Sequence, residues 1–556
     1  MQITADKQRK LNEIIAGMDR IRSPWWNVWR EISDYFLPRN YPWLLTDKET
    51  KTAAVRNEKL LDSTSVIALR TLTTGMMNGI TSPARPWLKL RLSGFREDTE
   101  EPYTHRVWLD EAARRMLVVM NGSNFYNALG ILYNEWAGMG TGAMSIYEDR
   151  ETVIRCFNHP VGSFYLDTDY TNRVIRFARK LSLSVEQTVQ EFGLENCSPR
   201  IQADYKAGGV RLRNDVMVWH LVEANTDDPL IRASAAFREF YWEHGKTDGM
   251  MLRLSAVDEF PTITPRWDVY ATDVYGSSAC MNVLPDVKQL QQMVKKRGQG
   301  LDLLVRPPML INRTLASSPK SLIAGGQTYV NGTELAEGAR PVFQVNFPFA
   351  EINGDIVDIR QRIQIGLFND LFKDIMSLST VRSATEIDAR REEKLIQLGP
   401  VLDRFADEGL DPAVDRIFQI CLRAGVFPPL PEGLEEYDIS VEYLGILADA
   451  QRAVGTVAIE RYMQFVGNLA PVFPEALEVP ATEEILRDYG DMLGLKTKHQ
   501  RPKEEVQAAR DQKQQQQSAL EAAQAGQSIV QGAQQLSQTD LGGGQNALAA
   551  MLGGGV

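Results

Sequence analysis

The spacing of apolar residues predicts two long amphipathic helices near the middle of the chain. In both, apolar residues recur on one face at intervals of three, four and seven. They are Val283, Val287, Leu290, Val294 and Leu301 in the first helix, and Ile352, Ile356, Ile359, Ile363 and Leu367 in the second. Polar residues follow the opposite faces: Lys288, Gln291, Lys295, Gln299 and Asp302, then Asp355, Arg362 and Asp370. With about 22 residues each, the helices would be matched in length at roughly 33 Å, which predicts a hairpin whose outer faces meet other copies of the chain.

The segment between the two helices, residues 306–349, has a different pattern. Proline and glycine divide it into short pieces. Three of the pieces are strand-like: Leu310-Ile311, Thr328-Tyr329-Val330 and Val342-Phe343-Gln344-Val345. The pattern therefore predicts a small β module at the tip of the hairpin, although an inserted subdomain of an ordinary enzyme would give the same pattern.

The flanking sequence predicts a mixture of helices and strands. Before the hairpin we expect helices at 5–20, from Ser23-Pro24 onward, and at 57–80, 103–120 and 125–136, and a strand at 87–92. Residues 143–266 are β-rich, with a hairpin that pairs 161–166 with 173–183. After the hairpin we expect a helix from Ser383 that kinks at Gly399-Pro400, a helix from Asp411, a strand at 437–443 and a helix at 448–469.

Composition indicates a multidomain globular protein with an acidic balance. The chain has 556 residues, of which 44% are hydrophobic and 24% charged, and a net charge of −11. A protein that clamps DNA by its phosphates is usually basic, at least locally. An acidic surface suits DNA that must slide past without sticking, and it equally suits an ordinary cytosolic protein. No apolar run reaches the length of a membrane span, and the polar start indicates no signal peptide.

Motif searches point away from catalysis, cofactors and metals. The four cysteines and five histidines are scattered, without a Cys-x-x-Cys pair or a cluster: Cys156, Cys197, Cys280, Cys421, His105, His159, His220, His244 and His499. The glycines between Gly138 and Gly142 lead into a strand, whereas a phosphate loop would open a helix. Gly245-Lys246-Thr247 has Phe240 where a phosphate loop needs glycine. The acidic turn 167–172 lacks the sixth-position glycine and the final glutamate of a calcium loop.

An ordered set of segments resembles the head-to-tail connector (portal) proteins of short-tailed, T7-like bacteriophages. The segments are Trp25-Trp26-Asn27-Val28-Trp29-Arg30 through Pro38, Leu61-Asp62-Ser63 through Gly79, Ser82-Pro83-Ala84-Arg85-Pro86-Trp87, Pro265-Arg266-Trp267, Val274-Tyr275-Gly276, Asn282 through Lys288, and Ser383 through Pro400. The resemblance extends over roughly Ile14 to Pro474, in order along the chain.

The resemblance implies an α+β portal fold, mainly helical with β-rich wing and clip parts, assembled as a dodecameric ring. Its parts would be a wing (1–282), stem helix 1 (283–305), a clip (306–349), stem helix 2 (350–372) and a tunnel loop (373–382). A long kinked wing and crown helix (383–436), a crown (437–500) and a partly disordered Gln/Gly-rich tail (501–556) would follow.

The resemblance also implies a role and partners. The ring would occupy one capsid vertex of the virion, where double-stranded DNA passes during packaging and ejection, and assembly would take place in the host cytoplasm. Partners would be the large terminase, major capsid and scaffolding proteins, and tail adaptor and tail tube proteins. It implies neither enzyme activity nor a cofactor or membrane. Two alternatives from other classes are a nucleic-acid-processing enzyme of the packaging machinery and a capsid or scaffolding protein.

Candidate site residues follow from these parts. In a ring, each basic residue of the hairpin becomes a belt of charge that contacts phosphates at any register. The DNA-channel candidates are Lys288, Lys295, Lys296, Arg297, Lys373 and Arg382. For each of them, an ordinary solvated or salt-bridged face is the alternative. By position in the family pattern, Ser377, Leu378, Ser379 and Thr380 are assigned to the tunnel loop, and Arg313, Lys320, Tyr329 and Arg340 to terminase and tail docking on the clip.

Overall fold

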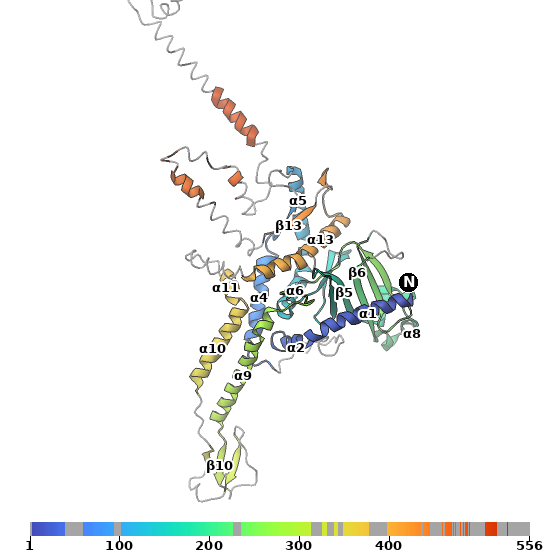
Figure 1. Ribbon diagram of the computed structural model, residues 1–556, viewed down its shortest axis with the longest axis vertical. Helices are drawn as coiled ribbons and strands as arrows, with labels where there is room; N and C mark the ends of the chain where they lie inside the picture. The colour runs from blue at the N-terminus through green and yellow to red at the C-terminus, as the bar shows by residue number, and fades with distance from the viewer. Residues whose placement is uncertain are drawn as a thin grey trace, which may run out of the picture. The chain divides into compact units, whose positions relative to one another are not determined.

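The fold combines helices with four separate antiparallel or mixed sheets, which confirms the α+β class (Figure 1). The computed structural model describes residues 3–38, 59–93, 102–225, 235–312, 325–330, 339–342, 348–376, 397–434, 438–444 and 506–519, with residues 527 and 531 and single residues or short runs between 459 and 489. Two compact units are present: residues 1–94 with 111–457, and residues 95–110 with 458–556.

A five-stranded antiparallel sheet forms the largest β structure. Its strands lie in chain order: β4 (Phe164–Thr168), β5 (Val174–Ser184), β6 (Asp215–Ala224), β7 (Phe237–Glu243) and β8 (Arg253–Val257). Side chains alternate between its two faces. Trp219 and Leu221 pack against the apolar stripe of α1 (Ala5–Arg22), whereas Val216 and Val218 pack on the other face with α7 (Val185–Phe192) and α8 (Pro199–Ala207). The predicted hairpin between 161–166 and 173–183 is the β4–β5 pair.

Three smaller sheets complete the β structure. β1 (Leu88–Leu92) pairs with β13 (Ile439–Tyr443), and β2 (Met144–Asp149) lies between β3 (Val153–Asn158) and β9 (Thr262–Ile263). In the segment between the two long helices, β10 (Met309–Asn312) lies between β11 (Gln327–Val330) and β12 (Ala339–Pro341). A β module at this place is therefore confirmed. Its third strand was predicted at 342–345, but it lies at Ala339–Pro341, and residues 343–347 are outside the described residues.

Helices form the rest of the core. They are η1 (Ser23–Trp25), α2 (Trp26–Tyr35), α4 (Thr64–Ile80), α5 (Tyr103–Gly122), α6 (Phe125–Met139), η2 (Leu194–Asn196), η3 (Gly209–Arg213), the π-helical turn η6 (Ala406–Leu410) and α13 (Asp411–Arg423). α6 is the central one: it packs on α2, α4, α9 (Ala279–Val305), β2 and β3, and its Tyr133 and Trp136 stack against Phe405.

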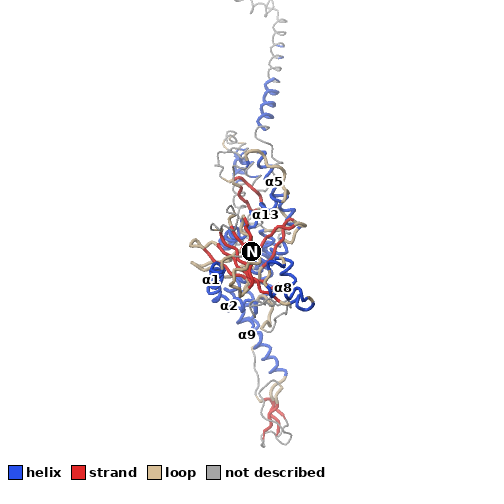
Figure 2. The backbone as a smooth tube through the Cα atoms, turned by 90° about the vertical axis from the view of Figure 1, so that its right-hand side faces the viewer, coloured by secondary structure: helices blue, strands red, loops and turns tan. Residues whose placement is uncertain are grey.

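The predicted hairpin is present, with helices of unequal length. α9 has 27 residues, and α10 (Phe349–Gly366) has 18. Phe368, which has a φ of 54°, interrupts the second helix before α11 (Asn369–Met376). α9 and α10 run side by side, with the strands β10–β12 following the far end of α9 (Figures 1 and 2).

Two further predictions of helix geometry need correction. The helix predicted from residue 57 begins at Thr64, because the backbone N–H groups of Leu61 and Asp62 are bound by a side chain of α9. Leu61, predicted to face inward, is 54% exposed. The kink predicted at Gly399-Pro400 stays a prediction, because the helix before residue 397 lies outside the described residues; a π-helical turn follows at Ala406–Leu410. The start of that helix at Ser383 is outside the described residues. Within the described part of the chain, no helix combines the length and apolarity needed to cross a bilayer.

Candidate functional site: the helical hairpin and its anchor

The first hairpin helix, α9, is fixed at its N-terminus by a buried serine. The Ser278 hydroxyl accepts a hydrogen bond from Met281 N at 3.1 Å, which caps the helix, and donates to Gly138 O at 2.8 Å. One side chain thus ends α6 and begins α9. Ser278 is 1% exposed, so these two hydrogen bonds are buried and fix the direction in which α9 leaves the core.

The glycine-rich run after α6 allows two backbone segments to cross at this point. Gly140, with a φ of 83°, lies against Gly276, and a Cβ on either residue would overlap the carbonyl oxygen of the other. Trp267 N donates to Gly140 O at 2.8 Å, and Gly276 N donates to Thr141 Oγ1 at 2.9 Å. As predicted, the run leads into a strand, β2.

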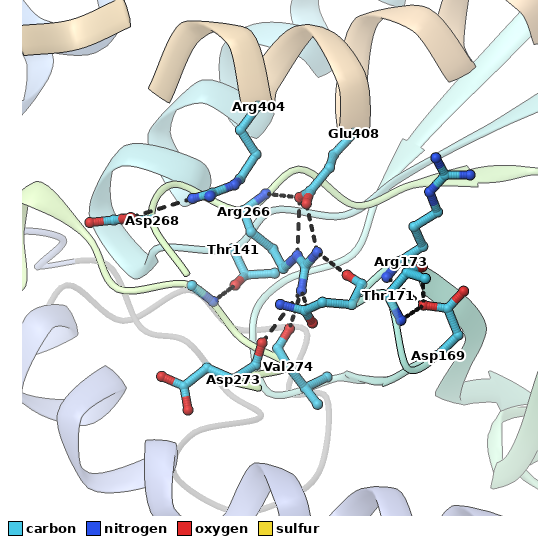
Figure 3. A network of polar contacts seen from close by, with 12 residues as sticks. Thr141, Asp169, Thr171, Arg173, Arg266, Asp268, Asp273, Val274, Arg404 and Glu408 are labelled. Carbon is cyan, nitrogen blue, oxygen red and sulfur yellow. Dashed lines mark hydrogen bonds and ion pairs between the residues drawn. The ribbon is translucent and has the colours of Figure 1, made fainter. Parts of the chain in front are cut away.

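Arg266 ties this crossing to the π-helical turn (Figure 3). Arg266 is 2% exposed, and its guanidinium binds Glu408 with two N–H groups, at 3.0 and 2.6 Å. It also donates to Asn172 Oδ1 and O, at 3.1 and 2.6 Å, and the backbone N–H of Arg266 reaches Glu408 at 3.0 Å. A planar guanidinium that binds a carboxylate with two N–H groups fixes both distance and orientation. Arg266 thereby joins the β4–β5 turn, the segment before α9 and η6.

The two hairpin helices pack closely near this anchor. Gly366 lies so near Val283 that a Cβ would overlap its Cγ1 atom, and Gly75 of α4 faces the Phe372 ring in the same way. Val283, Ile356, Ile359 and Ile363 are all less than 7% exposed. Near the anchor the inner stripe is therefore buried within a single chain, whereas Leu301 at its far end is 52% exposed.

A polar clamp on Asp62 holds both hairpin helices to the start of α4. Gln291 accepts from the backbone N–H groups of Leu61 and Asp62 at 2.7 and 2.8 Å, and donates to Asp62 O at 2.9 Å. Arg360 of α10 binds Asp62 Oδ2 at 2.6 Å. Burial alone would raise the pKa of the Asp62 carboxyl, but hydrogen bonds from Thr64 and Arg360 together outweigh it and lower that pKa. The clamp is thus made for an ionised Asp62.

The outer half of the hairpin has little cover within its own chain. The exposed fractions are 52% for Leu301, 39% for Leu304, 70% for Val305 and 55% for Val357. Lys295 and Lys296 are also exposed, whereas Arg297 donates to Asn353 Oδ1 at 3.0 Å across the hairpin. Exposed aliphatic residues grouped on one element indicate a surface that another chain covers.

The candidate channel residues have different surroundings. Lys288 pairs with Glu31 of α2 at 2.8 Å, so this cation is already matched within its own chain. Lys373 is exposed on α11. The remaining candidates lie outside the described residues or are described only by their backbone. Outside are Arg313, Lys320, Ser377, Leu378, Ser379, Thr380 and Arg382; by backbone alone, Tyr329 pairs with Ile311 and Arg340 with Leu310.

Sequence reasoning missed the residues that anchor the hairpin. Periodicity predicts that Gln291 faces solvent, but it is 5% exposed because it packs against Leu61 and Asp62. Those partners lie some 230 positions away along the chain, so the local pattern does not indicate the contact. Arg360 was not singled out. Only Ser278 carried a local signal, since a serine before a helical pattern is a common N-cap.

The histidines are less scattered in space than in sequence. Arg179 donates to His220 Nδ1 at 2.9 Å and contacts His159 Nδ1 at 3.1 Å, and His220 lies 3.5 Å from Glu239. His159 and His220 are both buried, and burial lowers the pKa of His220 to about 4. This is a packed polar network; within the described residues, no group of three or more His, Cys, Asp or Glu side chains is arranged to hold a metal ion.

Comparison with known proteins gives a consistent result. Residues 8–499 match the model of the family described as bacteriophage head to tail connecting protein. The chain is 35% identical over 539 residues, 96% of each chain, to a portal protein of Salmonella phage epsilon15. It is 34% identical over 506 residues, 90% of each chain, to a probable portal protein of Bordetella phage BPP-1.

Proposed function

The chain belongs to the bacteriophage head to tail connecting protein family and has the portal role at the capsid vertex, and from this premise we propose that twelve copies form a ring around double-stranded DNA with the α9–α10 hairpin as its stem. The observation that carries this proposal is the contrast along the hairpin. Its base is fixed by Ser278 and the Asp62 clamp, whereas its outer half exposes Leu301, Val305 and Val357. A closed ring of identical copies covers such faces without leaving an open edge.

In a ring, each exposed cation of the hairpin is repeated around the central axis. Lys295, Lys296 and Lys373 are exposed and would each recur once per copy, as belts of positive charge beside the DNA. Such belts contact phosphates at any rotation of the duplex and read no sequence. The acidic remainder of the chain, with a net charge of −11, opposes permanent adhesion. Lys288 is a weaker candidate, since Glu31 neutralises it.

The remaining parts are assigned by family pattern. Residues 306–349 form the clip on which the large terminase and later the tail adaptor and tail tube proteins dock. Residues 373–382 form the tunnel loop, and the wing contacts major capsid and scaffolding proteins. Assembly of the ring takes place in the host cytoplasm before the virion is complete.

Negative-stain images of the purified full-length protein test the ring. We expect rings with a central hole, and class averages give the number of copies. Monomers, or closed empty shells, would overturn the proposal.

A clip deletion tests the docking assignment separately. Removing residues 306–349 deletes β10–β12 but leaves the Ser278 cap and the Asp62 clamp. We expect soluble protein that fails to recruit the packaging motor. Normal packaging by this variant would show that the motor docks elsewhere, without bearing on the ring itself.

A further inference from the structure

A groove of about 640 Å³ lies between α1 and the five-stranded sheet. One wall comes from α1 and the start of α2, with Asn12, Asp19, Arg22 and Trp26. The other comes from neighbouring strands and from the turn after β7; it is lined by Tyr165, Lys180, Trp219, His244 and Thr247. None of these residues belongs to the hairpin, so the portal stem gives this groove no role.

The groove concentrates positive charge on a chain that is acidic overall. Arg22 and Lys180 line it as cations, together with the imidazole of His244, against the single carboxylate of Asp19, which is already paired with Arg22 at 2.8 Å. The chain as a whole carries a net charge of −11. A local excess of cations on an acidic chain favours an anionic ligand at this place.

Aromatic rings hold these cations in position. The Arg22 guanidinium lies 3.8 Å from the centre of the Tyr165 ring and 4.8 Å from that of Trp26. Lys180 Nζ lies 5.9 Å from the centre of the Trp219 ring, and the His244 ring lies 5.7 Å from it. Cations held over ring faces lose less freedom when an anion binds.

Arg22 enters the groove with one donor left over. It is 4% exposed and donates to Gly162 O at 2.5 Å, Asp19 Oδ1 at 2.8 Å and the Tyr165 hydroxyl at 3.1 Å. Its buried Nε–H has no acceptor among the described residues. A buried N–H without an acceptor is costly, so an acceptor oxygen of a ligand bound beside Arg22 would relieve that cost.

From this arrangement we infer that the groove binds an acidic peptide segment of another protein, with a glutamate or aspartate carboxylate set among Arg22, Lys180 and His244. The rings decide between a peptide and a nucleic acid. A nucleotide base would stack on an open ring face, but Trp26, Tyr165 and Trp219 each already have a cation over one face. The polar groups of Asn12, Ser23 and Thr247 suit the amide groups of a peptide backbone.

The test uses the purified full-length protein and two labelled peptides. One alternates glutamate with leucine, and the other has glutamine in place of each glutamate. Fluorescence anisotropy at low ionic strength should detect binding of the acidic peptide only, weakening as salt is added. In Lys180→Gln and in His244→Gln, affinity should fall about tenfold, since a hydrogen bond to a charged group contributes on that scale. Lys206→Gln, on the exposed surface of α8, should bind as the unmodified protein does.

Location is tested by chemical modification. His244 is exposed, whereas His105, His159 and His220 are buried, so diethyl pyrocarbonate should modify His244 readily and the acidic peptide should protect it. The inference is overturned if the acidic peptide fails to bind at millimolar concentration, or binds equally to Lys180→Gln and Lys206→Gln. It is also overturned if a single-stranded thymidine oligonucleotide of equal charge protects His244 as well as the peptide does.

Discussion

At the scale of single residues, the Pro265-Arg266-Trp267 motif acts through the guanidinium of Arg266. The motif could be recognised in the sequence, but its purpose could not, because Glu408 and Asn172 lie far from it along the chain. Removing one partner of a buried ion pair leaves the other charge without compensation. Arg266 therefore holds three segments together, and the hairpin starts from one of them.

Replacing Arg266 by glutamine should lower the free energy of unfolding by about 3 kcal/mol, because Glu408 would keep a partly buried charge without its partner. Thermal unfolding followed by circular dichroism should show a midpoint several degrees lower. Arg114→Gln is the matched control: it breaks a solvent-exposed pair with Glu111, so its thermal midpoint should change little. Equal midpoints for the two variants would contradict the role assigned to Arg266.

A second residue-scale feature is the buried carboxyl of Glu135 in α6. It is 4% exposed, and its Oε2 atom has no hydrogen-bond partner among the described residues. Burial raises the pKa of Glu135 well above its usual value. The folded chain therefore retains a proton that the unfolded chain releases as pH rises above about 4.3.

The sign of the resulting pH dependence follows directly. The pKa of Glu135 is higher in the folded chain than in the unfolded one. Its contribution to the free energy of unfolding is therefore fully present at low pH and is lost as pH rises toward the folded pKa. Glutamine does not titrate, so the Glu135→Gln variant does not lose this stability as pH rises. The variant should match the unmodified protein near pH 4 and become more stable than it toward pH 8, by up to about 1.4 kcal/mol per pH unit. Thermal midpoints measured across this range check the difference. A variant that is less stable at pH 8 would show instead that Glu135 is ionised and paired.

At the scale of elements, the Gln291 carboxamide explains why the α4 helix begins late. It binds the N–H groups of Leu61 and Asp62, which are thereby kept out of a helix. Replacing Gln291 by alanine should cost about 2 kcal/mol, because those buried groups lose their partner. Hydrogen–deuterium exchange of a peptide covering residues 59–64 should become faster.

Gln299→Ala provides the control on the same helix, since Gln299 is exposed. It should leave exchange at 59–64 unchanged. If both alanine variants exchange alike, the clamp does not hold the start of α4.

The elements also show what the sequence can and cannot predict. The existence of the hairpin, the β module between its helices and the β4–β5 pair follow from local periodicity, and the structure has all three. Helix lengths did not follow, because they depend on contacts between distant segments. α9 begins early at the Ser278 cap, which is bound to Gly138, and α10 ends early where Gly366 meets Val283. The same limit explains why Gln291 was placed on the wrong face.

At the scale of the whole molecule, the Asp62 clamp gives the hairpin a pH limit. The pKa of Asp62 is lowered in the folded chain. Its contribution to the free energy of unfolding is therefore present at a pH above the usual pKa of a carboxyl group, and is lost as pH falls through the folded pKa. The Asp62→Asn variant should therefore differ from the unmodified protein at pH 7 and approach it below about pH 4. The rates at which the variant and the unmodified protein are cleaved at the base of the hairpin are compared, with pepsin at acidic pH and with thermolysin at neutral pH. A difference that persists unchanged at low pH would exclude an ionised Asp62 as the source.

We propose that assembly depends on the outer half of the hairpin, where folding within one chain leaves apolar side chains exposed. Val305 and Val357 are 70% and 55% exposed, so a charge at either position costs the isolated chain little. In a ring, the same charge would be buried against the next copy, and the penalty would recur at every interface. The Val305→Asp, Val357→Asp double variant should therefore keep the thermal midpoint of the unassembled chain but sediment as monomers. Val210→Asp, at an 85% exposed position in η3, should still form rings. If the double variant forms rings of normal size, neighbouring copies contact each other through other residues. The exposed apolar side chains of the hairpin would then be a binding surface for a different protein.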